Sequence, residues 1–249
     1  MRRNRKKYQR KNDLRAVKAQ YKSLTHHQED VKHLYDIPEY WTQMQTFKLP
    51  KYEYTIRDTK SGFTIVAFAD EYSEQYSTML TETYLRHLKT FGIDLSEVTV
   101  QTDNGSEFGA KKRDIKVPGF VNTIAIEYGA QHQYIPPGCS NANGDVESFH
   151  ATIEREFFEL ETFGSRKEFF QKAQVYQGFY NFVRVNFSKG GRSPIQLFLE
   201  DRPGISPKVI NFPVYDLDAL FRQKMELPTI KGRGQYVHKL PETMLLQQW

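Results

Sequence analysis

Three acidic residues, each within a distinctive local sequence, constrain the fold of this chain most strongly. Asp30 lies in residues 29–32 (EDVK), Asp103 in residues 101–108 (QTDNGSEF) and Glu147 in residues 143–150 (NGDVESFH). Carboxylates are hard oxygen ligands that bind Mg²⁺ or Mn²⁺ while leaving coordination positions for water and phosphate. If the three acids share one site, the fold has to join three segments that are far apart in the sequence.

The composition is that of one folded domain with appendages. The chain has 249 residues, of which 39% are hydrophobic and 14% aromatic, which is enough for a sizeable core. Its single cysteine, Cys139, excludes an internal disulfide and a cysteine-rich zinc site. No apolar run approaches the ~20 residues that cross a bilayer. We therefore expect a cytoplasmic protein of bacterial type that associates with the nucleoid and has no membrane partner.

Positive charge is concentrated at the amino end. Residues 1–24 contain ten Lys or Arg and one acid, Asp13, so this arm carries +9 and the rest of the chain −4, for a formal net charge of +5. Dense basic segments bind nucleic-acid phosphates by releasing counterions, and this binding weakens with salt. A solvated tail is the alternative. Leu14, Val17 and Tyr21 have helical spacing, which predicts a connector helix in the arm.

Hydrophobic periodicity and turn residues predict an α/β order of elements. Strands are expected at 27–34, 51–57, 63–69, 98–101 and 132–135, and helices at 73–90, 121–128, 143–160 and 167–184. The last of these helices has an aromatic-rich packing face, with the expected members Phe169, Phe170, Ala173, Val175, Tyr176, Phe179 and Tyr180. Beyond residue 203 the pattern weakens, and a strand at 235–238 is a candidate there.

These segments resemble the integrase core of Asp-Asp-Glu transposases, a family that includes insertion-sequence transposases and retroviral-type integrase catalytic domains. Residues 102–108 reproduce the family's Thr-Asp-Asn-Gly-x-Glu-Phe stretch, and residues 143–150 match its helix. The resemblance spans about residues 30–194. It implies a ribonuclease H-like α/β fold, with a mixed five-stranded sheet flanked by helices, a basic N-terminal helix and a small irregular or β C-terminal extension. The corresponding divisions are a connector arm (1–24), a catalytic core (25–202) and the extension (203–249).

The resemblance also implies the site and its chemistry. Asp30, Asp103 and Glu147 would be the catalytic and metal-binding residues, with two Mg²⁺ or Mn²⁺ ions as cofactors. Two such ions, roughly 3.5–4 Å apart, activate a nucleophile and stabilise the leaving oxygen of a phosphodiester. The implied enzyme is a polynucleotidyl transferase that acts in DNA integration, recombination and transposition: hydrolysis frees a 3′-OH, which then attacks target DNA.

Other residues compete for these roles. The rival acids are Asp36, Asp58 and Asp70 for Asp30, and Asp145 and Glu154 for Glu147. Asp58 is expected to be structural, because it precedes a chain reversal at residues 61–62. Asp30 lacks the aromatic residue that the family often has shortly before this position. The separation of 44 positions between Asp103 and Glu147 is longer than usual for the family, and the loop at 109–119 can hold the surplus.

DNA contacts are expected from the basic arm, from the loop after Asp103 and from the helix that carries Glu147. The candidates are Arg2, Arg3, Arg5, Lys6, Lys7, Arg10, Lys11, Lys111, Lys112, Arg113, His150 and Arg155. His150 either orients a phosphate or water, or only completes the packing.

The expected partners are DNA, as element ends and as target, and further copies of the chain in a homo-oligomer. A separate helix-turn-helix protein is a further expected partner, because the first 25 residues contain neither that motif nor a His-His-Cys-Cys zinc module. Two alternatives remain open: a ribonuclease H-like nuclease, and a truncated DNA-binding transposase relic without activity.

Overall fold

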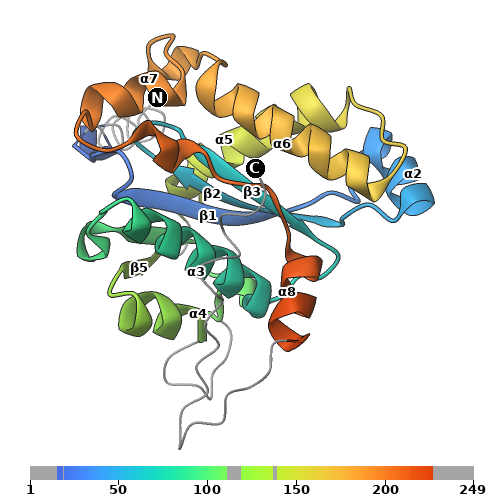
Figure 1. Ribbon diagram of the computed structural model, residues 1–249, viewed down its shortest axis with the longest axis horizontal. Helices are drawn as coiled ribbons and strands as arrows, with labels where there is room; N and C mark the ends of the chain where they lie inside the picture. Colours follow the sequence, from blue (N-terminus) through green and yellow to red (C-terminus); the bar gives the residue numbers. More distant parts are fainter. Residues whose placement is uncertain (1–15, 19, 111–118, 137–138, 227–249) are drawn as a thin grey trace, which may run out of the picture.

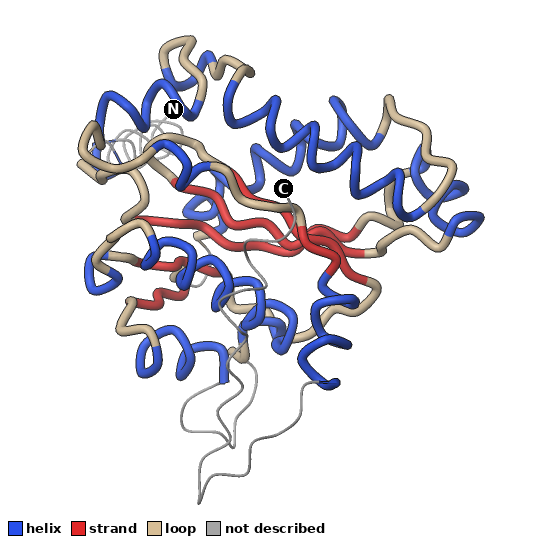
Figure 2. Tube along the Cα trace, viewed as in Figure 1, coloured by secondary structure: helices blue, strands red, loops and turns tan. Residues whose placement is uncertain are grey.

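A mixed β-sheet with helices on both faces forms the centre of the molecule (Figures 1 and 2). The computed structural model describes residues 16–18, 20–110, 119–136 and 139–226. The sheet has the order β5-β4-β1-β2-β3-β6. Its strands are β1 (His26–His33), β2 (Tyr52–Asp58), β3 (Thr64–Ala69), β4 (Thr99–Thr102), β5 (Gln131–Tyr134) and β6 (Tyr215–Asp216).

Strand directions give this sheet the predicted ribonuclease H-like arrangement. β2 is antiparallel to both β1 and β3, whereas β4 is parallel to β1 and β5 is parallel to β4. The five expected strands are confirmed to within one or two residues at each end. The count of five was wrong by one, because the two-residue strand β6 pairs with Ala67 and Phe68 at the edge of β3. A strand this short has too few residues to show an alternating pattern in the sequence.

Helices cover both faces of the sheet, so the central strands β2 and β3 are buried on both sides. The α-helices are α2 (Pro38–Phe47), α3 (Glu74–Thr90), α4 (Gly119–Asn122), α5 (Gly144–Ile153), α6 (Arg166–Phe182), α7 (Pro194–Asp201) and α8 (Leu217–Glu226). In Figure 1, α5 and α6 lie on one side of the sheet, and α3 and α4 on the other. Along β3, Ile65 and Ala67 join the core on the α3 side, while Val66 and Phe68 pack with α6. This alternation is the two-residue period of a strand.

The helices confirm most of the predicted packing faces. The helix expected at 73–90 is present as α3, and its buried apolar residues are Tyr76, Met79, Leu80, Tyr84, Leu85 and Leu88. In α6 the prediction was wrong for Val175 and Phe179, which are 72% and 45% exposed. The buried side of this helix follows Phe169, Ala173 and Tyr176. Val175 lies two positions after Ala173, about 200° around the helix, so it points away from the sheet.

Helix α2 was not predicted, although Pro38 at its first turn is a common helix start. The helix expected at 143–160 is present as α5, which continues into a π-helical turn at Glu154–Phe158. The helix expected at 121–128 consists of α4 and a second π-helical turn at Thr123–Glu127. No helix among residues 16–18, 20–110, 119–136 and 139–226 is long and apolar enough to cross a membrane.

The described part of the C-terminal extension packs into the core next to α3. Val209, Phe212 and Leu217 are at most 1% exposed and belong to the same apolar cluster as Leu80 and Leu85. At the other end of the chain, Leu24 is fully buried in that cluster, although it lies within the predicted arm. Residues 16–18 of the predicted connector helix are helical; residues 1–15 and 19, residues 111–118 of the surplus loop and the candidate strand at 235–238 lie outside the described residues.

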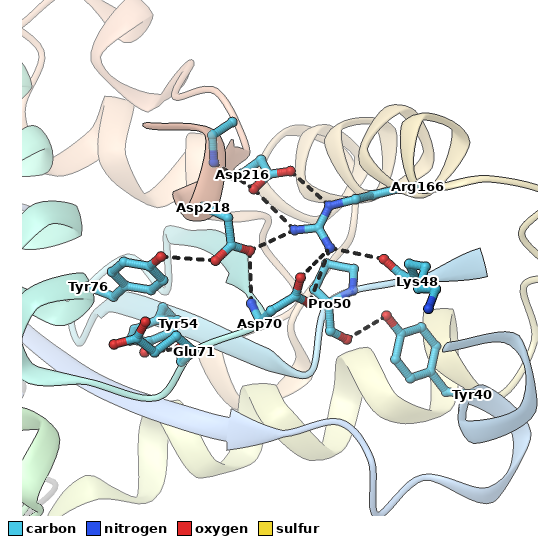
Figure 3. Close-up of polar contacts among 11 residues, drawn as sticks. Tyr40, Lys48, Pro50, Tyr54, Asp70, Glu71, Tyr76, Arg166, Asp216 and Asp218 are labelled. Carbon is cyan, nitrogen blue, oxygen red and sulfur yellow. Dashed lines mark hydrogen bonds and ion pairs between the residues drawn. The ribbon is translucent and has the colours of Figure 1, made fainter. Parts of the chain in front are cut away.

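Arg166 links the C-terminal segment to the sheet through ion pairs (Figure 3). Arg166, the first residue of α6, forms ion pairs with Asp70 after β3, Asp216 in β6 and Asp218 in α8, at 3.2, 2.9 and 2.8 Å. Asp218 also accepts hydrogen bonds from the Tyr76 hydroxyl and from the backbone N–H of Asp70. We call these four charged residues the Arg166 cluster. It joins four segments through one guanidinium, whose five donors suit several carboxylates at once.

Candidate functional site

Asp30 lies where β1 continues beyond its pairing with β4. The register between these strands runs from His26 to Gln28, so β1 extends past the end of β4 at Asp30. Side chains alternate along a strand, and those of Gln28 and Lys32 reach the segment around α5, at Ala142 and Glu154. Asp30 therefore faces α5. One of its carboxylate oxygens accepts a hydrogen bond from the backbone N–H of Val31 at 2.9 Å.

Asp103 follows directly after β4, and its local turn brings a second acid beside it. The Asp103 carboxylate accepts a hydrogen bond from the backbone N–H of Gly105 at 2.7 Å, and the Asn104 side chain donates to the carbonyl of Ile135 at 2.9 Å. A single helical turn, Ser106–Phe108, then carries Glu107. Carboxylate oxygens of Asp30, Asp103 and Glu107 all lie within 4.8 Å of one another. We call these residues the three-acid group.

Gly105 is required by the position of Glu107. A Cβ atom at residue 105 would collide with both carboxylate oxygens and the carboxyl carbon of Glu107. The glycine thus leaves the space through which Glu107, 4% exposed, reaches the group. The hydroxyl of Tyr72 forms a hydrogen bond with Glu107; burial, this bond and the negative charges of the three-acid group all raise the pKa of Tyr72. The Tyr72 hydroxyl therefore stays protonated and donates this hydrogen bond, and the Glu107 carboxylate accepts it.

The pKa of Asp30 is shifted by burial and by the like charges around it. Burial raises the pKa of Asp30 to about 7; the hydrogen bond from Val31 opposes this rise, and the charges of Asp103, Glu107 and Glu147 add to it. His150 lies beside Asp30, with 3.6 Å between its Nδ1 and a carboxylate oxygen. Burial, followed by the charges of Lys32 and Arg57, lowers the pKa of His150 to about 3. His150 is therefore neutral and does not compensate the carboxylates.

Glu147 lies in the first turn of α5, and the sheet fixes the start of this helix. The buried Gln28 side chain accepts hydrogen bonds from the backbone N–H groups of Asp145 and Val146, at 3.0 and 3.1 Å, and donates to the carbonyl of Ala142 at 2.6 Å. Glu147 is exposed and is not part of the three-acid group in the described chain. It precedes His150 by three positions and so lies on the same side of the helix.

Four of the five rival acids have partners elsewhere, and the fifth, Asp36, is exposed. Asp145 forms an ion pair with Lys18, and Glu154 forms one with Lys32. Asp70 belongs to the Arg166 cluster. Asp58 has the expected structural role: it accepts hydrogen bonds from the backbone N–H groups of Leu24 and Ser61 and from the Ser61 hydroxyl.

Of the predicted DNA-binding residues, only two are described. Arg155 is exposed on the π-helical turn after α5, and its Nε donates to the carbonyl of Ala151. His150 is 8% exposed and its Nε2 lies 3.1 Å from the Thr55 hydroxyl, which is a packing position. The remaining candidates, which are Arg2, Arg3, Arg5, Lys6, Lys7, Arg10, Lys11, Lys111, Lys112 and Arg113, lie outside the described residues.

The donor set suits a hard divalent cation. Three carboxylates can supply oxygen ligands, and the space beside Gly105 keeps the third of them within reach. Sequence reasoning missed Glu107 as a member of this group, although it lies within the quoted motif. It also missed Tyr72, for which the sequence has no signal, because the contact depends on how the loop after β3 meets the turn after β4.

Comparison with known proteins agrees with this architecture. No family model matches the chain. Over 195 residues the chain is 26% identical to a protein of Spiroplasma virus SpV1-C74 named "Putative integrase ORF3", an alignment that covers 74% of this chain and 51% of the relative. The chain spans about half the length of that relative, 51%.

One solved structure has low similarity to the chain. The cryo-EM structure of the simian T-cell lymphotropic virus intasome in complex with PP2A regulatory subunit B56 gamma contains a chain with a TM-score of 0.48 and 14% sequence identity. The match covers 70% of this chain and 54% of that one.

Proposed function

We propose that the chain is a polynucleotidyl transferase that cleaves DNA and joins DNA strands with the help of divalent cations. The observation that carries this proposal is the three-acid group, because it combines Asp30 and Asp103 from distant parts of the sequence. The similarity to a viral integrase-like protein supports the same class of reaction.

In this proposal the acids hold cations against a scissile phosphate. Asp30 and Asp103 would hold a first ion, with Glu107 as a further oxygen ligand, and Glu147 in the first turn of α5 would hold a second. Mg²⁺ or Mn²⁺ supplies the positive charge that activates an oxygen nucleophile and stabilises the leaving oxygen. The protein provides no covalent nucleophile; its carboxylates orient the reacting groups, and water or a DNA 3′-OH attacks.

The surrounding residues keep the acids in place. Gln28 holds the start of α5 against β1, so Glu147 remains close enough to raise the pKa of Asp30 through its charge. Neutral His150 fills the space behind Asp30 without neutralising it. We further propose element ends and target DNA as substrates, contacts to their phosphates from the basic arm, a homo-oligomeric assembly and a separate protein for end recognition.

A strand-transfer assay tests the proposal. Labelled oligonucleotides are incubated with the purified chain and Mg²⁺ or Mn²⁺, and the products are separated on denaturing gels. Joined strands longer than the substrate support a transferase. Nicks without joined strands would assign the site to a nuclease, and DNA binding without any cation-dependent product would leave only a binding protein.

A further inference from the structure

Four aromatic rings lie next to the three-acid group. His33 and Tyr52 are opposite each other in the β1–β2 register, and their ring centres are 5.2 Å apart. Tyr35 lies 5.2 Å from His33 and 5.9 Å from Tyr52. Tyr72 lies 5.2 Å from His33 and 5.5 Å from Tyr52, and its hydroxyl bonds to Glu107. We call these four residues the aromatic surface; it is continuous with the candidate cation site.

The rings of the aromatic surface differ from those of the core in their exposure. Tyr35 is 37% exposed and the other three are partly exposed, whereas Tyr40 and Phe158 in the core are fully buried. None of the five ring pairs within the surface is parallel: the interplanar angles range from 38° to 89°. Because the rings do not stack on one another and keep part of their surface exposed, a further planar group can reach them.

Hydrogen bonds hold the ends of the surface in place. The Tyr35 hydroxyl lies 2.7 Å from Nδ1 of His33, and the Tyr72 hydroxyl is bonded to Glu107. Rings that are already ordered lose little conformational entropy when a ligand binds. Their polar edges also suit a ligand that is planar and hydrated at its rim, rather than a purely apolar one.

We propose that the aromatic surface stacks unpaired bases of the DNA strand whose phosphate lies at the three-acid group. This inference rests on the proposed function. The bond between Tyr72 and Glu107 places the first ring against the carboxylates, so the nucleotide next to the reacting phosphate meets Tyr72, and its neighbours meet Tyr52 and Tyr35. Base stacking on aromatic side chains tolerates any sequence. The aromatic surface therefore keeps the end of this strand unpaired and binds it independently of its base sequence.

The test measures stacking separately from catalysis. A single-stranded oligonucleotide with 2-aminopurine near its 3′ end is titrated with the full chain in Ca²⁺, and quenching of 2-aminopurine fluorescence reports stacking. The wild-type chain is expected to quench the probe. The double variant Tyr35→Leu/Tyr52→Leu is expected to lose most of the quenching and to bind the probe at least about fivefold more weakly. Because the fluorescence measurement needs no cleavage, a chain that is inactive in strand transfer can still quench the probe.

Two further variants control for folding and for chemistry. Tyr35→Phe keeps the ring and is expected to quench like the wild type. Phe187→Leu removes an 87% exposed ring from a separate turn and is expected to have no effect. Thermal unfolding and circular dichroism confirm that each variant is folded. Equal quenching by the folded double variant overturns the proposal. So does a loss of self-association with unchanged quenching, which would assign the surface to contacts between proteins.

Discussion

Two groups of three acids in this molecule balance their charge in different ways. In the Arg166 cluster, Asp70, Asp216 and Asp218 surround one guanidinium, and the chain itself supplies the positive charge (Figure 3). In the three-acid group, Asp30 lies beside neutral His150, and its raised pKa reflects burial and repulsion between like charges. Clustered acids therefore form ion pairs within the fold in one place, and in the other they form a group that could hold a cation.

The largest difference should appear between two matched Asp→Asn substitutions. Asp103→Asn is expected to lower cation-dependent strand transfer by about a thousandfold or more, because an amide is a weaker cation ligand than a carboxylate. Its free energy of unfolding should not fall, since one repelling charge is removed. Asp218→Asn is expected to keep the activity and to lose about 1 kcal/mol of stability through its weakened bond to Arg166. Activity gels and urea unfolding measure both.

Salt-dependent DNA binding supplies the control for these two variants. Both should bind nonspecific DNA as the wild type does, because neither substitution removes a basic residue. Undiminished strand transfer by Asp103→Asn would remove this residue from the site and end the contrast between the two groups.

The next largest effect is expected on stability when Arg166 is replaced, because it compensates the acids of the Arg166 cluster. Arg166→Met is expected to lower the free energy of unfolding by about 3 kcal/mol, because it leaves the partly buried carboxylates of Asp216 and Asp218 and the exposed one of Asp70 close together without a cation. Arg192→Met is the matched control: Arg192 pairs with Glu200 and is 44% exposed, so its loss should change stability by less than about 1 kcal/mol. Equal effects of the two substitutions in urea unfolding would show that the Arg166 cluster is not a structural centre.

The two groups also differ in how well the sequence predicts them. The resemblance predicts Asp30 and Asp103 as site residues, and their carboxylates lie close together in the folded chain, while their role stays a prediction. The five main strands and the buried face of α3 could be predicted from periodicity. The Arg166 cluster joins segments about 50 to 150 positions apart that carry no motif, so only the folded chain reveals it.

Glu107 shows a different limit of sequence reasoning. It belongs to the quoted motif, yet its role depends on the turn at Gly105 and on the hydroxyl of Tyr72. Glu147 stays a prediction, since its carboxylate lies outside the three-acid group while its charge still acts on Asp30. Helix α8 and strand β6 were missed because residues after 203 show weak periodicity, although Leu217 and Leu220 pack into the core.

Cation binding is expected to stabilise the chain through the three-acid group and not through the Arg166 cluster. Addition of Mg²⁺ or Mn²⁺ is expected to raise the free energy of unfolding of the wild-type chain, by roughly 2.7 kcal/mol when the free cation reaches about 100 times its dissociation constant. The increase should vanish in Asp103→Asn and persist in Asp218→Asn. Thermal unfolding with Mg²⁺, and with EDTA as the cation-free reference, measures it. An equal increase in both variants would place the bound cation elsewhere.

The buried acid Glu53, which belongs to neither group, should make the free energy of unfolding depend on pH. Glu53 in β2 is fully buried; burial raises its pKa to about 7, and the 2.8 Å hydrogen bond from the Thr55 hydroxyl opposes this rise. Because the folded chain holds this proton more tightly than the unfolded chain, where the pKa is 4.5, the stability that Glu53 contributes is complete below about pH 4.5 and is lost as the pH rises towards about 7. Glu53→Gln keeps the shape and the acceptor oxygen but cannot ionise. Relative to the wild type, the free energy of unfolding of Glu53→Gln should therefore rise by about 2 kcal/mol between about pH 5 and pH 8.

Urea unfolding across this pH range, with exposed Glu159→Gln as the control, checks the prediction. Parallel pH profiles of wild type and Glu53→Gln would mean that Glu53 is compensated in the folded chain, as the acids of the Arg166 cluster are.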